Sequence, residues 1–101
     1  MMTYDVIVHL VVHGRVQGVG YRAFAEHQAR TRGLHGWVRN CRDGTVEAVL
    51  AGGSAAVEDM IAACRRGPPG SRVDAINRTA GDGAALKERP PGQAFSVLPT
   101  I

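Results

Sequence analysis

Residues 5–22 read DVIVHLVVHGRVQGVGYR and contain both a strand pattern and a glycine-rich loop. All even positions of Asp5–His13 are aliphatic, a period of two that predicts a strand with one face in the core. Gly14, Gly18 and Gly20 then end the alternation, and helix-favouring residues follow over Tyr21–Arg32. The stretch therefore predicts a strand, a tight loop and a helix in direct succession.

The middle of the chain predicts a hairpin followed by a second helix. His35–Asn40 and Thr45–Ala51 have strand character, and Asp43-Gly44 between them is a strong hairpin turn signal. Ser54 is the predicted N-cap of a helix that ends near Gly67. Its apolar residues have helical spacing: Val57, Met60, Ile61 and Cys64.

The last third of the chain is less regular. Ser71–Thr79 and the short segment around Phe95 and Val97 are predicted strands, and Ala80–Gly92 is a predicted mobile loop. The order strand, helix, strand, strand, helix, strand matches the ferredoxin-like βαββαβ sandwich. We therefore expect an α+β fold with one antiparallel sheet covered on one face by two helices, and a single domain over residues 1–101.

Length and composition narrow the function. The chain has 101 residues, of which 45% are hydrophobic, and a formal net charge of +3. Six arginines and only one acid, Glu26, lie between His13 and Arg42, which suits a small anionic ligand better than nucleic acid. The longest apolar run is far below the roughly 20 residues that cross a bilayer. We expect a cytoplasmic monomer with no membrane partner, in which Cys41 and Cys64 are reduced.

The loop between the first strand and the first helix is a candidate anion site. Unpaired N–H groups and the helix dipole favour an anion there, and glycines let the backbone approach it closely. The nucleotide P-loop pattern fails, because no Lys and Ser/Thr follow the glycines. Gly18-x-Gly20-x-x-Ala23 fits the dinucleotide fingerprint literally, but the chain is too short for the doubly wound sheet that this motif serves.

Three blocks in order carry a family resemblance: Gly14–Arg22, Gly36–Asn40 and Asp43–Glu47. Together they closely resemble acylphosphatase, a small hydrolase of carboxyl-phosphate mixed anhydrides. The likeness covers about Val6–Gly67 and weakens after Ser71. It implies the ferredoxin-like sandwich, in agreement with the order of the predicted elements.

The resemblance also implies which residues form the site. Arg22 takes the place of the family's phosphate-binding arginine, and Asn40 that of its water-positioning asparagine. The phosphate cradle is implied to consist of backbone N–H groups of one loop: Arg15, Val16, Gln17, Gly18, Val19 and Gly20. No cofactor or metal is implied, and inorganic phosphate is expected as product and competitive ligand of a small-molecule acyl phosphate substrate.

Two other functions compete with this one. Ferredoxin-like sandwiches also include RNA-binding domains that stack bases on sheet aromatics, but no strand here has closely spaced aromatic residues. Acylphosphatase-like segments also occur inside larger proteins that process carbamoyl phosphate, and this chain lacks the cysteine pairs of a zinc motif. His9 and His13 share the second face of the first strand and are expected to be packing or surface residues.

Overall fold

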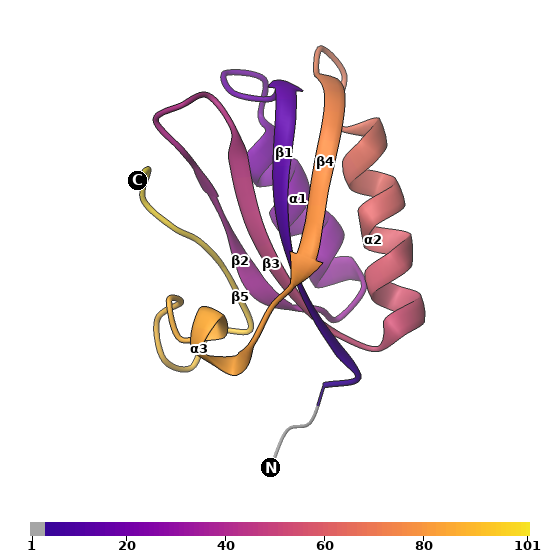
Figure 1. The fold of residues 1–101 in the computed structure, drawn as a ribbon, viewed down its shortest axis with the longest axis vertical. Coiled ribbons are helices and arrows are strands. Elements are labelled where there is room, and N and C mark those ends of the chain that lie inside the picture. Colours follow the sequence, from indigo (N-terminus) through magenta and orange to yellow (C-terminus); the bar gives the residue numbers. More distant parts are fainter. Residues whose placement is uncertain (1–3) are drawn as a thin grey trace.

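The computed structural model describes residues 4–101, in which strands and helices alternate along most of the chain (Figure 1). The strands and helices are β1 (Val6–Arg15), α1 (Tyr21–Thr31), β2 (His35–Asn40), β3 (Val46–Gly52), α2 (Ser54–Arg66), β4 (Arg72–Ala80), α3 (Gly83–Leu86) and β5 (Phe95–Val97). Every strand and both long helices that the sequence pattern predicts are present, with ends that differ by two residues or fewer.

The five strands form one sheet in the order β4-β1-β3-β2-β5. Pairing is antiparallel among the first four strands, as expected. β5 differs, because it runs parallel to β2, with Val97 opposite Val38. The chain reaches β5 only after crossing from the β4 edge of the sheet to the opposite edge, so the direction of β5 is set by a long connection that has no strand periodicity.

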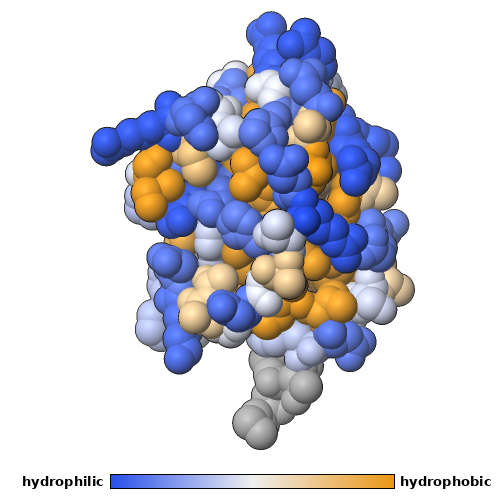
Figure 2. All heavy atoms as spheres, viewed as in Figure 1, coloured by the Kyte–Doolittle hydropathy of each residue, from blue (hydrophilic) through white to orange (hydrophobic). Residues whose placement is uncertain are grey.

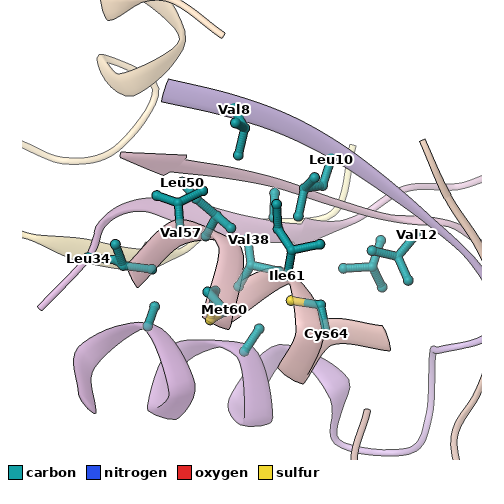
Figure 3. Packing of buried hydrophobic residues seen from close by; sticks show 14 of the residues in the cluster. Val8, Leu10, Val12, Leu34, Val38, Leu50, Val57, Met60, Ile61 and Cys64 are labelled. Atoms are coloured by element: carbon teal, nitrogen blue, oxygen red, sulfur yellow. The ribbon is translucent and has the colours of Figure 1, made fainter. Parts of the chain in front are cut away.

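Helices α1 and α2 cover one face of the sheet (Figure 1). Val8, Leu10 and Val12 of β1 point into this layer and meet Met60 and Ile61 of α2 in one buried cluster (Figure 3). Each such aliphatic side chain contributes about 1.5–3 kcal/mol when it is fully buried. Because α1 packs against this face of the sheet, the position of its first turn is fixed. The end of the preceding glycine loop is fixed with it.

The opposite face of the sheet is covered in part by α3 and the C-terminal segment (Figure 1). Trp37 packs there against Leu86 and Leu98, and its Nε1 donates a hydrogen bond of 2.7 Å to the Ala85 carbonyl. Seen from this side, apolar residues gather in the middle of the face between hydrophilic ones (Figure 2). This small second core holds β5 and its flanking segment on the sheet.

Two local predictions need correction. The segment Ala80–Gly92, predicted as a loop, contains the helical turn α3, whose first turn is capped by Asp82 accepting a bond of 2.9 Å from the Ala85 N–H. Ser54 is the first residue of α2 instead of its N-cap; Gly53 occupies that position and offers no side-chain cap. No helix within residues 4–101 is both long and apolar enough to cross a membrane.

Candidate active site

The loop that joins β1 to α1 is shaped by its glycines. β1 bulges between His13 and Gly14, where a Cβ on Gly14 would lie 2.1 Å from the Arg72 carbonyl oxygen of β4. Gly18 and Gly20 have φ angles of 74° and 79°, in the left-handed region that other residues rarely adopt. The loop therefore bends sharply twice before α1 begins at Tyr21.

This bending leaves a row of free backbone donors. Among the described residues, the N–H groups of Val16–Gly20 donate no hydrogen bond. Gly20 is the N-cap of α1 and provides no side chain to cap the first N–H groups of the helix. Loop and helix N-terminus together form a concave array of positive partial charge, which is the usual site for a phosphate or another anion.

Gln17 fastens this loop to the β2–β3 hairpin. Its Nε2 donates hydrogen bonds of 2.8 Å to both the Cys41 and the Thr45 carbonyl oxygens. The hairpin turn is itself ordered by Asp43, whose carboxylate accepts from the N–H and the hydroxyl of Thr45. The side chain of Gln17 thus connects the anion-binding loop to the strand end that carries Asn40.

Arg22, in the first turn of α1, is half-buried and makes no hydrogen bond or ion pair with a residue in the described part of the chain. Glu26 lies one turn further along the helix, but the cation that it contacts is Arg30, at 3.4 Å. A cation at a helix N-terminus is mildly unfavourable to the dipole. A half-buried guanidinium with free donors in this place is suited to an anionic ligand.

Asn40, the last residue of β2, points to the side of the sheet that α1 covers. Its Oδ1 is buried and has no hydrogen-bond partner among the residues described. Leaving a buried acceptor unsatisfied costs about 1–3 kcal/mol, so such atoms are uncommon outside functional sites. A water molecule or ligand that donates to this oxygen would remove the cost.

These groups surround one cavity of about 360 Å³ at the N-terminal end of α1. Arg22, Asn40 and most of the predicted cradle residues line it, namely Val16, Gln17, Gly18 and Gly20. Two other predicted cradle residues, Arg15 and Val19, do not line the cavity. Arg15 is exposed at the end of β1, and the side chain of Val19 packs on the core.

Sequence reasoning missed four residues that line the cavity: Tyr21, Ala23, Glu26 and Val97. Glu26 lies four residues after Arg22, so helical spacing alone could have placed both side chains on one side of α1. No local pattern in the sequence indicated Val97, because its position at the cavity depends on the parallel pairing of β5 with β2.

A separate ionic cluster lies on the other face of the sheet. Glu47 accepts a hydrogen bond of 2.7 Å from Arg39, and its second carboxylate oxygen lies 2.6 Å from the Nε2 of His9. Burial on its own would raise the pKa of Glu47, but hydrogen bonds from His9 and Arg39 and their positive charges lower it below its ordinary value. The Arg39 guanidinium also stacks 4.5 Å from the ring of Trp37. His9 therefore belongs to an ion-pair network across three strands and lies outside the cavity.

Fold and cavity together define a class: a ferredoxin-like α+β sandwich with a glycine-rich loop between its first strand and first helix, whose N–H groups donate to no residue in the described part of the chain. The family model that matches this chain, over residues 8–89, is Acylphosphatase. The chain belongs to the acylphosphatase family, and the match extends beyond the segment in which the sequence motifs are clear.

Individual relatives agree with this assignment. An acylphosphatase from Bradyrhizobium diazoefficiens is 54% identical over 95 residues, which cover 94% of this chain and 96% of the relative. The crystal structure of acylphosphatase from Bacillus subtilis superposes with a TM-score of 0.79 at 35% identity, covering 92% of this chain and 98% of the other. The structure of an acylphosphatase from Coxiella burnetii superposes with a TM-score of 0.80 at 27% identity, covering 97% of this chain and 100% of the other.

Proposed function

We propose that this protein hydrolyses the carboxyl-phosphate bond of acyl phosphates in the cavity at the start of α1. The free N–H groups of the loop and the guanidinium of Arg22 hold the phosphoryl oxygens and spread the negative charge that develops on them. The neutral amide of Asn40 orients one water molecule without taking its proton, because the buried Oδ1 is an acceptor that lacks a donor.

The proposed hydrolysis requires no reactant other than the acyl phosphate and one water molecule. The oxygen of the water attacks phosphorus, the bond from phosphorus to the acyl oxygen breaks, and that electron pair leaves on the carboxylate. A phosphoryl oxygen of the substrate accepts the proton released by the water. Because a carboxylate is a good leaving group, no strong general acid is needed, and the residues at the cavity supply positioning and charge instead.

The observation that carries this proposal is the meeting in one cavity of three features that have no partner among residues 4–101: the loop N–H groups, the Arg22 guanidinium and the buried Oδ1 of Asn40. The test follows benzoyl phosphate hydrolysis by ultraviolet absorbance in EDTA. We expect metal-independent turnover by the wild type and a loss of about 10²–10³-fold or more in kcat/KM for Arg22→Ala, since it removes the charged donor to the transition state. Arg65→Ala, an exposed arginine at the end of α2, is the matched control.

Inorganic phosphate separates the two proposed roles. Arg22→Ala should abolish competitive inhibition by phosphate, whereas Asn40→Ala should lose turnover and keep most of the inhibition. A folded Asn40→Ala variant with wild-type kcat would show that Asn40 does not orient the attacking water. A folded wild type without turnover would refute the hydrolase and leave a phosphate-binding module.

The competing functions receive less support. The only tryptophan of the chain is buried between the sheet and α3, so this ring offers no stacking platform for RNA bases. The chain is about 50% identical to relatives named acylphosphatase over almost their whole length, which supports acyl phosphate hydrolysis by this domain over an accessory role in carbamoyl phosphate processing.

We further propose that the protein acts as a cytoplasmic monomer. The groups that the proposed reaction uses, namely the loop N–H groups, Arg22 and Asn40, meet within one chain, so the proposed reaction does not call for a second copy. Cys41 and Cys64 are both free thiols, as is common in a reducing compartment. Size-exclusion chromatography with light scattering tests the oligomeric state, and a dimer mass at micromolar concentration would contradict it.

A further inference from the structure

Three side chains that line the cavity have no role toward the phosphate or the water in the proposed reaction. They are Ala23, Glu26 and Val97, which remain once the loop, Arg22, Asn40 and the buried Tyr21, whose hydroxyl donates to the Cys64 carbonyl oxygen, are set aside. The first two lie on α1, and Val97 faces them from β5. These three residues, here called the rim, are the part of the cavity lining left to contact the acyl group of a substrate whose phosphate is held by the loop and Arg22.

Two of these residues present apolar surface. Val97 is 41% exposed and is one of two large apolar side chains within residues 4–101 that are so exposed; the other is Ile101. Ala23 is also exposed and offers a methyl group without charge. Covering Val97 with an apolar acyl group would remove that surface from water, which favours binding in proportion to the area covered.

The third residue, Glu26, adds a negative charge to the rim. Its contact with Arg30 is long, at 3.4 Å, and engages only Oε2. Arg30 also donates a hydrogen bond of 2.8 Å to the Phe95 carbonyl oxygen, so its guanidinium is shared. Arg22, which lines the cavity with Glu26, is occupied by the phosphate in the proposed complex. Glu26 is therefore incompletely neutralised when substrate is bound.

From this arrangement we propose that Ala23, Glu26 and Val97 form an acyl subsite that selects acyl phosphates with uncharged, apolar acyl groups over those with a second carboxylate. This inference rests on the proposed function and adds a substrate class to it. The selection against an anionic acyl group comes from repulsion by Glu26, and the preference for an apolar one comes from contact with Val97.

The test compares 4-methylbenzoyl phosphate with 4-carboxybenzoyl phosphate, which differ by the exchange of a methyl group for a carboxylate. We expect the wild type to favour the methyl compound in kcat/KM by about tenfold or more, since like charges repel strongly at a partly buried rim. Glu26→Gln should lower that ratio by about threefold or more, and the preference that remains comes from contact of the methyl group with Val97. Glu58→Gln, which removes a carboxylate on α2 that pairs with Arg78, should leave the ratio as in the wild type.

A second variant tests the apolar part of the subsite. Val97→Ser should lower the preference for benzoyl phosphate over acetyl phosphate by about fourfold, roughly the effect of one buried methylene or slightly more. Thermal unfolding of both variants verifies that they are folded. If both benzoyl substrates are hydrolysed and Glu26→Gln leaves their ratio unchanged, the inference is overturned while the hydrolase stands. If neither is hydrolysed by the folded wild type, the proposed function fails and the inference fails with it.

Discussion

Gln17 connects the two halves of the cavity, because its side chain spans from the anion-binding loop to the strand end that carries Asn40. Removing the Gln17 side chain leaves Arg22 and the loop N–H groups on their own elements but takes away the contacts that align them with Asn40, which in the proposed reaction orients the water. We expect Gln17→Ala to lower kcat by about tenfold, since small misplacements of reacting groups are costly. Competitive inhibition by inorganic phosphate should weaken much less.

A double-mutant cycle distinguishes alignment from loss of stability. If Gln17 acts by aligning the water with the phosphate, Gln17→Ala should cost far less kcat in an Asn40→Ala background than in the wild type. Urea unfolding reports the separate effect on stability. Equal losses of kcat in both backgrounds, or a loss of phosphate binding as large as the loss of kcat, would contradict the alignment role.

The two cysteines should differ sharply in reactivity. Cys64 is buried between α2 and the sheet, and burial raises the pKa of its thiol to about 11, so almost no thiolate forms at neutral pH. Cys41 is half-buried on the hairpin. Iodoacetamide should therefore modify Cys41 alone in the native protein, as read by mass spectrometry. A Cys41→Ser variant should remain unmodified until it is unfolded in urea, and rapid labelling of native Cys64 would contradict this.

At the scale of secondary structure, the sequence was informative wherever local chemistry decides the outcome. Strict alternation predicted β1, Asp43-Gly44 predicted the hairpin, and helical spacing predicted α2, because each signal lies within the element itself. The direction of β5 could not be predicted in this way, since its partner β2 is far away in the chain. The loop, Arg22 and Asn40, which the family resemblance singled out, do line one cavity, but nothing in the sequence indicated that Val97 would join them there.

Alanine substitutions at different glycines test how strongly the backbone at each position requires glycine. A Cβ on Gly18 would touch nothing within 4 Å, so only its φ of 74° opposes a side chain there. We expect Gly18→Ala to destabilise the protein by about 1–2 kcal/mol, the cost of the left-handed conformation. Gly36→Ala should cost considerably more, because its Cβ would lie 1.8 Å from the Val49 carbonyl oxygen.

Gly83→Ala is the matched control for this series, since Gly83 has open space around it and no positive φ. It should leave stability unchanged or raise it slightly, by less than about 1 kcal/mol, because alanine restricts the unfolded chain. Urea unfolding at constant m-value measures all three variants. A Gly18→Ala protein as stable as Gly83→Ala would show that the loop does not require its left-handed residue.

At the scale of the whole molecule, the Glu47 cluster joins β1, β2 and β3 on the face opposite α1 and α2. The folded state lowers the pKa of Glu47 below its ordinary value of 4.5. A group whose pKa is lower when folded stabilises the protein above its unfolded pKa, and this contribution disappears as the pH falls through the folded pKa. The ionised Glu47 carboxylate should therefore stabilise the folded protein fully at neutral pH. This stabilisation should be lost as the pH falls below 4.5.

The comparison with Glu47→Gln isolates this contribution, because Asp43 and Glu58, whose pKa values the folded state also lowers, remain in both proteins. Urea unfolding at a series of pH values should show the wild type more stable than the variant near neutrality, with a difference that shrinks once the pH falls below 4.5. A difference that stays constant down to about pH 3 would mean that the charge of Glu47 contributes nothing to stability.

Because the cluster is on the far face from the cavity, phosphate inhibition of the folded Glu47→Gln variant should match that of the wild type. If Glu47→Gln weakened phosphate inhibition as well, this would show that a structural change at Arg39 is transmitted along β2 to Asn40.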